Sequence, residues 1–434
     1  MKYQRKVDVL VGLQWGDEGK GKIVDVLSTR YKIIARFQGG PNAGHTLEFD
    51  NKKYVLHTVP SGIFHKDCIN IIGNGVVIDP VIFYKEFSRL DLSVKEFNDR
   101  LLLSQKAHLI MPSHRLMDAA LEHSKGAAKI GSTLKGIGPA YTDKIARNGL
   151  RLGNLLQDNF KEKYNQLKGH HLNLIKSLNF EYAGVKLDGD DFEAYEKKWF
   201  EGVEFIKNLV LAESEIFIND ALKNGSSILA EGAQGSLLDV DFGSYPFVTS
   251  SNTITAGACT GLGVAPSAIG EVYGLFKAYC TRVGSGPFPT ELTEETGEKL
   301  RTVGREFGAT TGRPRRCGWL DLPALKYSIM LNGVTQLIMT KADVLDSFQE
   351  FKVCVAYDYK GKKIDYIPFD YDPANLKPIY TTLKGWNCCL ETYQSFDSLP
   401  PELSTYVKYI EDSVNVPVTI ISTGPDRLQT IIRN

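Results

Sequence analysis

The sequence has no excess of charge of either sign, because 51 lysine and arginine residues balance 51 aspartate and glutamate residues in 434 positions. A chain without a basic excess has no electrostatic footprint for nucleic acid and no polybasic anchor for a membrane. Long apolar runs are also absent, since the longest fall far short of the roughly 18 residues that a membrane-spanning helix needs. We therefore expect neither nucleic acid nor a membrane among the partners.

The sequence contains seven cysteines, and their spacing does not suggest pairs. None of the seven cysteines forms a Cys-x-x-Cys pair, and Cys388 and Cys389 are adjacent. This pattern fits neither a zinc site nor a disulfide framework, which favours a reducing compartment. The basic segment Met1–Lys6 is followed by an apolar stretch too short for a signal peptide. The sequence predicts a cytoplasmic protein.

Short apolar runs, many of them followed by glycine or polar loops and then by helical patterns, define the fold class. Such alternation predicts an α/β fold with a large, mainly parallel central β-sheet and flanking helices. The predicted strands are Val7–Gly12, Ile33–Phe37, Ile69–Ile72, Leu101–Leu103, Ser227–Ala230, Val272–Ala278, Gln336–Thr340 and Val418–Ser422.

Two segments depart from this alternation. Asn154–Lys223 is rich in Lys, Glu, Leu and Phe with helical periodicity, which predicts a helical insertion packed on the sheet. Lys352–Tyr359 and Ile364–Phe369 predict a β-hairpin around a turn at Lys360–Lys363. No linker rich in Pro, Gly or Ser divides the chain, so we expect residues 1–434 to form one large domain.

The first chemistry-bearing loop runs from Gly12 to Lys22, between a strand and a helix predicted at Ile23–Leu27. Glycines let backbone N–H groups approach an anion, lysines neutralise it, and the helix N-terminus adds its dipole. Gly16 to Lys22 matches the G-x4-G-K part of a phosphate-binding loop, but Ile23 stands where Ser or Thr should bind magnesium. Asp17 is the candidate replacement ligand. A glycine-rich turn with solvated charges is the alternative, which the strand–loop–helix context disfavours.

The second loop, Gly39–Thr46, contains one titratable side chain, His45. Histidine is the natural proton donor or electrostatic partner near neutral pH. A lone histidine is usually structural, but the glycine-rich setting favours a function. The other histidines, including His170 and His171, have no such setting and are expected to be structural.

Three further stretches combine polar side chains with turn residues. Gly131–Tyr141 with Arg147 behind it offers hydroxyls and cations for a phosphate, although a capped turn before a charged helix is equally plausible. Gln234, in a glycine-flanked turn after a strand, can read a base or carbonyl, and Tyr245–Thr253 is dense in hydroxyls; ordinary turn chemistry explains either. Gly308–Arg316 carries threonines and arginines suited to phosphate or carboxylate, with a solvated basic turn as the alternative.

The preceding Glu291–Arg305 is charged and punctuated by glycine, so we expect a loop there that orders on substrate. Thr340–Asp343 has the T/N-K-x-D pattern that reads guanine in GTP-binding proteins. A carboxylate at Asp343 can accept both guanine N1–H and its exocyclic amine, while the Lys341 stem covers the ring. Ser422–Pro425 follows the last predicted strand and can close the base pocket.

Taken together, these motifs resemble the adenylosuccinate synthetase family, and the resemblance spans nearly the whole chain. It is carried by Gln14–Lys22, Asn42–Thr46, Gly136–Tyr141, Glu231–Gly235, Ala309–Arg313, Thr340–Asp343 and Ser422–Pro425. It implies a fold like that of P-loop NTPases and the condensation of IMP with L-aspartate, driven by GTP, to give adenylosuccinate, GDP and phosphate. It also implies one Mg²⁺ per subunit, a homodimer and a place at the committed step from IMP to AMP.

The resemblance assigns the catalytic roles to Asp17, His45, Lys20 and Gln234. Asp17 would remove the N1 proton of IMP and, with the backbone carbonyl of Gly44, hold Mg²⁺. His45 would act as a general acid on the departing GDP side, and Lys20 with the loop amides would spread the charge of the transferring phosphoryl group.

The implied IMP-binding residues are Asp17, Glu18, Gly19, Lys20, Asn42, Ala43, Gly44, His45, Thr133, Gln234, Thr249, Arg313 and, from the neighbouring subunit, Arg147. The implied aspartate-binding residues are Ala309, Thr310, Thr311, Gly312, Arg313 and Arg315. The implied GTP-binding residues are Gly16, Asp17, Glu18, Gly19, Lys20, Gly21, Lys22, Gly44, His45, Thr46, Arg315, Lys341, Ala342, Asp343, Ser422, Thr423 and Gly424. Pro314 departs from the family pattern, in which we expect a third consecutive arginine.

Two other classes of function share some of these motifs. A GTP-binding switch or assembly protein needs the phosphate loop and Thr340–Asp343, but it does not need His45, Gln234 and an arginine loop around a second small molecule. An ATP-dependent ligase or kinase needs no guanine reader. The dependence of GTP consumption on IMP and aspartate, and the nucleotide preference, separate these classes.

Overall fold

A ten-stranded β-sheet forms the centre of the molecule, in a computed structural model that describes residues 5–308, 312–369 and 371–433. All neighbouring strands in it are parallel except the last pair at one edge, β19 and β20. The strands, in spatial order, are β20 (Thr430–Ile432), β19 (Val418–Ser422), β15 (Gln336–Thr340), β11 (Ile269–Lys277), β1 (Val7–Gly12), β10 (Ile228–Glu231), β2 (Ile33–Arg36), β5 (Ile69–Ile72), β7 (Leu101–Ser104) and β9 (Leu211–Ala212).

The eight predicted strands are confirmed as the inner eight of this order, and the predicted fold class with them. These strands are covered on both faces, so their sequences are nearly continuous apolar runs. The two edge strands were not predicted. β9 has two residues and lies in the segment expected to be helical, and β20 is a three-residue strand.

Alternate side chains of β1 supply the two halves of the core. Val7, Val9 and Val11 belong to a cluster that also includes residues of α8, α9, α11 and α12. Leu10 belongs to a second cluster with Ile23, on α1. The first helix therefore packs on the face of the sheet opposite to these four helices. The helices concerned are α1 (Lys20–Leu27), α8 (Ser214–Lys223), α9 (Thr255–Leu262), α11 (Leu322–Asn332) and α12 (Pro401–Val414).

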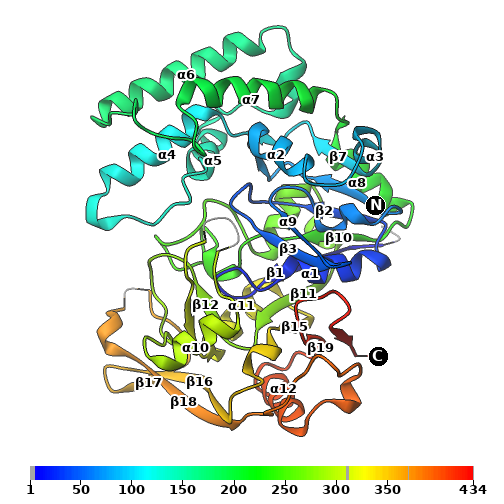
Figure 1. The fold of residues 1–434 in the computed structure, drawn as a ribbon, viewed down its shortest axis with the longest axis vertical. Helices are drawn as coiled ribbons and strands as arrows, with labels where there is room; N and C mark the ends of the chain where they lie inside the picture. Colours follow the sequence, from blue (N-terminus) through cyan, green and yellow to red (C-terminus); the bar gives the residue numbers. More distant parts are fainter. Residues whose placement is uncertain (1–4, 309–311, 370, 434) are drawn as a thin grey trace.

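The remaining helices, except one, gather at one end of the molecule (Figure 1). They have their own core, in which Trp199 and Tyr195 of α7 and Tyr164 of α6 are fully buried. α6 and α7 fill most of the predicted helical insertion, whereas α8, at its end, packs on the sheet. These helices are α2 (Pro80–Phe87), α3 (Val94–Arg100), α4 (Pro112–Ser124), α5 (Ile137–Ala146), α6 (Phe160–Ser177) and α7 (Phe192–Lys207).

Small sheets complete the fold, the largest of them at the opposite end of the molecule (Figure 1). Their strands are β3 (His45–Phe49) with β4 (Lys52–Leu56), β6 (Val77–Ile78) with β8 (His108–Leu109), β12 (Cys280–Arg282) with β13 (Arg316–Gly318), and β14 (Leu320–Asp321) with β16 (Glu350–Tyr359), β17 (Lys362–Ile364) and β18 (Leu376–Lys384).

The predicted hairpin is present, but its second strand was placed wrongly. The turn has two residues, Lys360 and Gly361, both with positive φ (53° and 77°), so β17 begins at Lys362 and ends at Ile364. Such two-residue turns match the twist of the flanking strands and resume pairing at once. The longer partner of β16 is β18.

The loop expected at Glu291–Arg305 is also corrected, because α10 (Glu295–Val303) occupies most of it. Leu300 is fully buried, and acidic residues in the first turn suit the helix dipole. None of the described helices combines the length and apolarity that crossing a bilayer requires.

The parallel sheet brings the predicted loops to one edge. Parallel strands share the direction of their carboxyl ends, and ligands of open α/β sheets bind outside those ends. The final residues of the strands concerned are Gly12 of β1, Arg36 of β2, Glu231 of β10, Lys277 of β11, Thr340 of β15 and Ser422 of β19. Five of the candidate motifs, those at Gly12–Lys22, Gly39–Thr46, Glu231–Gly235, Thr340–Asp343 and Ser422–Pro425, begin at or shortly after these strand ends, whereas Gly131–Tyr141 and Gly308–Arg316 follow helical segments.

Candidate active site

A cavity of about 1040 Å³ lies among these loops. Loops from distant parts of the chain line it together. The predicted site residues that line it are Gly16, Asp17, Glu18, Gly19, Lys20, Gly21, Lys22, Asn42, Ala43, Gly44, His45, Thr46, Thr133, Gln234, Thr249, Arg313, Arg315, Lys341, Asp343, Ser422 and Gly424.

A few predicted residues lie elsewhere. Ala342 and Thr423 are fully buried and do not line the cavity, so they shape its wall from behind. Gly312 is outside the lining, and Arg147 is exposed at the C-terminal cap of α5, away from the cavity of its own chain. The predicted residues Ala309, Thr310 and Thr311 lie outside the described part of the chain.

The phosphate loop makes a tight turn in left-handed backbone conformations. Gly16, Asp17 and Gly19 have φ values of 84°, 61° and 89°. Glycine adopts this region freely, and aspartate tolerates it better than most residues. α1 begins at Lys20, earlier than the predicted Ile23, so the positive end of its dipole lies at the cavity.

Glu18 is turned into the loop. Its carboxylate is fully buried, accepts the backbone N–H groups of Gln14 (3.2 Å) and Gly16 (2.9 Å), and forms an ion pair with Lys20. A Cβ at Gly12 would lie 2.3 Å from this carboxylate, and one at Gly235 would lie 2.6 Å from it. Glu18 therefore braces the loop and partly neutralises Lys20, and its carboxylate is not free for a ligand.

Lys22 also differs from a phosphate-loop lysine that is free to bind. Its ammonium group donates hydrogen bonds to Ser422 Oγ (2.8 Å) and to the backbone carbonyls of Gly424 (2.7 Å) and Gln429 (2.8 Å). Burial lowers the pKa of Lys22 to about 7, against the opposing charge of Asp343. Lys22 thus fastens the first helix to the loop after β19.

His45 is held by a carboxylate that the sequence analysis did not single out. Its Nδ1 lies 2.5 Å from Oε1 of Glu231, whose carboxylate also accepts the backbone N–H (2.9 Å) and the hydroxyl (2.7 Å) of Ser61. Burial, together with the charge of Arg36, lowers the pKa of His45 to about 4 despite Glu231. The imidazole is therefore neutral at pH 7, with Nδ1–H donated to Glu231. Its Nε2 has no hydrogen-bond partner among the described residues.

Gly21 allows this histidine to approach α1. A Cβ at Gly21 would lie 2.7 Å from Cβ of His45 and 3.2 Å from its backbone. Real Cβ atoms do not come this close without a shift of the neighbour, so any larger residue at this position would push β3 away from the helix. The last glycine of the phosphate loop is thus explained by packing against His45.

Several buried polar atoms on the cavity wall lack partners within the described residues. They include both amide atoms of Gln234, whose backbone is left-handed (φ 56°), and Oδ1 of Asn42. Buried polar atoms in native proteins are nearly always satisfied, by protein, water or ligand. Their position around a large cavity is what a polar ligand requires.

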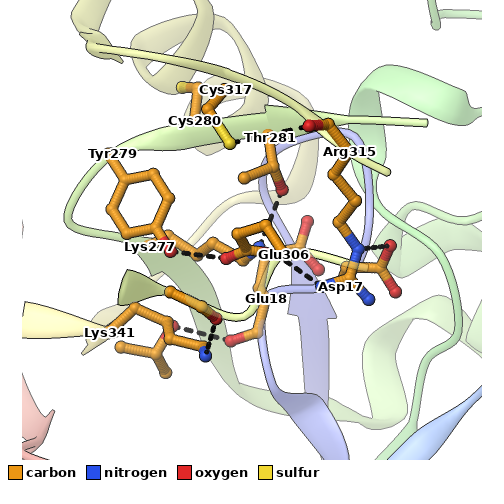
Figure 2. A network of polar contacts seen from close by, with 12 residues as sticks. Asp17, Glu18, Lys277, Tyr279, Cys280, Thr281, Glu306, Arg315, Cys317 and Lys341 are labelled. Carbon is orange, nitrogen blue, oxygen red and sulfur yellow. Dashed lines mark hydrogen bonds and ion pairs between the residues drawn. The ribbon is translucent and has the colours of Figure 1, made fainter. Parts of the chain in front are cut away.

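Arg315 stands between two carboxylates (Figure 2). Its Nε lies 2.9 Å from Oδ2 of Asp17, and its Nη1 lies 2.5 Å from Oε2 of the fully buried Glu306. Lys277, also fully buried, donates to the other oxygen of Glu306 (2.9 Å). Burial alone would raise the pKa of Glu306, but Lys277 and Arg315 lower it to about 2, so the carboxylate is ionised. The sequence analysis missed both Glu306 and Lys277.

The guanine-reading pattern lies beside the phosphate loop. Thr340 Oγ1 donates to the backbone carbonyl of Glu18 (2.6 Å), which joins the end of β15 to that loop. Lys341 has a left-handed backbone (φ 59°) and donates to the carbonyl of Gly304 (2.9 Å). Burial raises the pKa of Asp343, against the opposing charge of Lys341, and the side chain lines the cavity.

One group of buried side chains outside the cavity has the composition of a metal site. Nε2 of His114 and Nε2 of His171 each lie 2.8 Å from the same oxygen of Asp143. The backbone N–H of Met111 donates to Nδ1 of His114, so the proton of that ring is on Nε2 and is donated to Asp143. This group is a satisfied hydrogen-bond network that ties α4, α5 and α6 together.

Comparison with known proteins settles the family. The model of the family described as adenylosuccinate synthetase matches residues 9–431. The chain belongs to the adenylosuccinate synthetase family. Two relatives named adenylosuccinate synthetase are those of Bacteroides fragilis, 59% identical over 428 residues that cover 99% of both chains, and of Christiangramia forsetii, 60% identical over 427 residues that cover 98% of this chain and all of the relative.

Solved structures agree with the assignment to this family. The fully ligated adenylosuccinate synthetase of Plasmodium falciparum superimposes with a TM-score of 0.92 at 37% identity, covering 99% of this chain and 100% of the other. A cyanophage S-2L succinoaminodeoxyadenylate synthetase, 22% identical with a TM-score of 0.61 over 99% and 95% of the chains, shares the fold. Membership of the adenylosuccinate synthetase family makes the chain a ligase of AMP synthesis that joins IMP and L-aspartate, with GTP as the nucleotide of the family.

Proposed function

We propose that the chain makes adenylosuccinate in the cavity described above, through a 6-phosphoryl-IMP intermediate. The observation that carries this proposal is the convergence of Asp17, His45 and Gln234, which follow three different strands, in one cavity with the Lys341–Asp343 pattern. A site for GTP alone does not need His45 and Gln234.

The reaction begins at the purine ring. The carbonyl oxygen O6 of IMP is a poor leaving group, so it must be phosphorylated before an amine can replace it. Asp17 takes the N1 proton, O6 attacks the terminal phosphorus of GTP, and the bond from that phosphorus to GDP breaks. The amine of aspartate then displaces phosphate at C6. The Asp17 carboxylate suits the role of base because it lines the cavity, is 32% exposed and makes one ion pair within the described residues, with Arg315.

The chain offers several groups to hold the charge that moves in this step. The N-terminus of α1 and Lys20 lie where the phosphates would sit, and positioning and electrostatics dominate phosphoryl transfer. His45 is neutral in the free protein, and the approach of a polyanion raises the proton affinity of its Nε2. Glu231 keeps the other ring nitrogen protonated, so a proton taken at Nε2 can be given to the departing GDP.

Magnesium fits the residues present. Ile23 replaces the hydroxyl of ordinary phosphate loops and is buried, whereas the carboxylate of Asp17 and the half-buried Gly44 line the cavity. Carboxylate and carbonyl oxygens are the ligands that Mg²⁺ prefers. Asp17 and the backbone carbonyl of Gly44 would hold one ion per subunit, and the ion would neutralise charge on the phosphates of GTP.

The remaining assignments follow the resemblance to the family. We propose that Thr133, Gln234, Thr249 and Arg313 hold IMP. Lys341, Asp343, Ser422 and Gly424 would enclose guanine. The loop that carries Thr310, Thr311 and Arg313 would receive the carboxylates of aspartate, and Arg315 would serve the nucleotide.

The direct test is an absorbance assay for adenylosuccinate with IMP, GTP, aspartate and Mg²⁺, each omitted in turn. We expect product only in the complete mixture, and GDP release only when IMP is present. GTP hydrolysis that proceeds equally without IMP and aspartate would indicate a nucleotide switch and contradict the proposal. Equal rates with ATP would contradict the guanine assignment.

Nucleotide preference should depend on Asp343. In Asp343→Asn, the amide N–H₂ group faces the amine of guanine, and two donors cannot pair. The same N–H₂ group can donate a hydrogen bond to the 2-oxo group of xanthine. We expect the ratio of kcat/KM for GTP to that for XTP to fall by roughly 10²–10³-fold, as is typical when a buried partner is left unpaired. Measurement of both nucleotides with one enzyme preparation makes the ratio independent of the active fraction. An unchanged ratio would show that Asp343 does not read the base.

Arg147 should act across a homodimer interface. It is exposed at the left-handed end of α5 (φ 68°), beside Ile145, whose exposed fraction is 78%. An inactive Arg147→Leu protein, mixed with an equal amount of Asp17→Asn protein that keeps Arg147, should recover about a quarter of wild-type activity, because random pairing completes one site in each mixed dimer. Failure to recover activity, while mixed dimers form, would place Arg147 outside a shared site.

A further inference from the structure

Glu306 is a buried carboxylate that does not line the cavity but holds a residue that does. It follows α10 and is fully buried, as is its partner Lys277 at the end of β11. Figure 2 shows it between Lys277 and Tyr279 on one side and Arg315 on the other. A buried charge persists only when it is paired and hydrogen-bonded, and this one is paired twice.

The two carboxylate oxygens of Glu306 have different hydrogen-bond partners. Oε1 accepts hydrogen bonds from Lys277 Nζ (2.9 Å) and from the hydroxyl of Tyr279. Oε2 accepts from Nη1 of Arg315. The backbone N–H of Arg315 also donates to the carbonyl of Glu306 (2.9 Å), so main chain and side chain of Arg315 are fixed by the same residue.

On the cavity side, Arg315 contacts Asp17, and this contact holds the guanidinium less firmly than Glu306 does. Nε of Arg315 lies 2.9 Å from the Asp17 carboxylate, yet it makes no hydrogen bond with any described residue, because its N–H is not directed at an acceptor. The guanidinium is therefore placed from behind, by Glu306, while the side chain of Arg315 lines the cavity. A planar guanidinium in this state suits a phosphate or another oxyanion.

We propose that Glu306 is a positioning residue for the nucleotide site, which fixes the Arg315 guanidinium so that it meets the phosphates of GTP. This inference rests on the function proposed above. Lys277 completes the arrangement, because its ammonium balances the buried carboxylate and is itself held by the hydroxyl of Thr281 (2.7 Å).

Glu306→Gln tests the proposal with little change of shape. The single amide oxygen is expected to face the two donors Lys277 and Tyr279, which leaves the amide N–H₂ against the N–H of Arg315. Two donors cannot pair, so Arg315 loses its anchor. We expect the KM for GTP to rise about tenfold, the size typical for loss of a charged hydrogen bond, while the KM for IMP stays within twofold.

The matched control is Thr281→Val. It removes a hydrogen bond from the same buried Lys277 but does not touch Glu306 or Arg315. Its melting temperature should fall, as that of Glu306→Gln should, but its KM for GTP should equal that of the wild type. A merely structural role of Glu306 would make the two variants alike in KM.

Equilibrium binding gives a readout without turnover. Calorimetry with GTP and Mg²⁺, in the absence of IMP and aspartate, should show about a tenfold weaker affinity for Glu306→Gln. Arg315→Gln should weaken it similarly, and the double variant should be no weaker than Arg315→Gln alone, since both changes remove one arrangement. Additive losses, or a Glu306→Gln affinity within twofold of the wild type, would overturn the proposal.

Two further outcomes are decisive. If Glu306→Gln does not fold, Glu306→Asp replaces it. That variant keeps the charge but retracts the carboxylate by one methylene, and an unchanged GTP affinity would then overturn the proposal. If the wild-type protein makes no adenylosuccinate from the complete mixture, the proposed function fails whatever the variants do. An active wild type with normal GTP binding in the Glu306 variants refutes only the positioning role.

Discussion

Replacement of Asp17 by asparagine is expected to lower kcat roughly 10⁴-fold while the fold stays intact. The amide can neither take the N1 proton of IMP nor offer a charged ligand to a cation. Asparagine is the appropriate replacement because it tolerates the left-handed backbone that this position requires (φ 61°). Loss of activity in this variant therefore reports chemistry and not a distorted loop.

Asp50→Asn is the matched control. Asp50 also has a left-handed backbone (φ 51°), but it is an exposed residue in the turn after β3, outside the cavity lining. Its kcat should equal that of the wild type, and both variants should melt within a few degrees of it. A kcat for Asp17→Asn within tenfold of the wild type would remove Asp17 as the base, because a carboxylate that takes a proton in the transition state contributes at least about 10²-fold.

The second large effect is expected at His45. In His45→Asn, the side-chain N–H₂ can still donate to Glu231 as Nδ1–H does, but nothing replaces Nε2 at the cavity. We expect kcat to fall by roughly 10²–10⁴-fold, the range for loss of a proton-transfer group, with the KM for IMP nearly unchanged. Single-turnover measurement of GDP formation checks that phosphoryl transfer is the affected step. A kcat within threefold of the wild type would leave His45 a structural residue.

The same variant should alter the response of stability to acid. The pKa of His45 is about 4 in the folded protein, below its ordinary value of 6.5, because burial disfavours the imidazolium. Between these values the unfolded chain binds more protons, so wild-type stability falls as pH falls from about 6.5 to 4. His45→Asn lacks this loss. The free energy of unfolding of His45→Asn, measured with urea, is therefore expected to approach that of the wild type as the pH is lowered. The difference between the two proteins should shrink by ~3 kcal/mol from pH 7.5 to pH 4.

The sequence predicts the sheet well where both faces of a strand are covered by other parts of the chain. Strands such as Val7–Gly12 and Gln336–Thr340 are covered on both faces, and their unbroken apolar runs reveal them with correct ends. It predicts less well where tertiary contacts decide the structure. β9 pairs with β7 through two residues only, and α10 is stabilised by the burial of Leu300, which a charged and glycine-punctuated pattern conceals.

The loops of the site are predictable because their chemistry is local in sequence. Glycines, Asp17 and His45 stand in short patterns that can be recognised in the sequence, although their roles come from the resemblance to the family. Glu231 and Glu306 were missed for the opposite reason. Each acts through a partner 186 or 9 residues away, and the pairing follows from strand order and from the path of the chain after α10. The hydrogen bonds of Lys22 to Ser422, Gly424 and Gln429 were not predicted, because the spacing within the phosphate loop contains no information about the loop after β19.

The hydrogen bonds of Lys22 reach Ser422, Gly424 and Gln429, which lie 400, 402 and 407 residues further along the chain. This separation has a consequence for folding during synthesis. A nascent chain whose last strand is still inside the ribosome already has its glycine turn but not the far wall of the base pocket. GTP can therefore not hold together a partly synthesised chain, since a ligand stabilises only the state that binds it. A nucleotide can therefore stabilise only a chain in which β19 and the loop after it have formed, and removal of residues 418–434 should abolish that stabilisation.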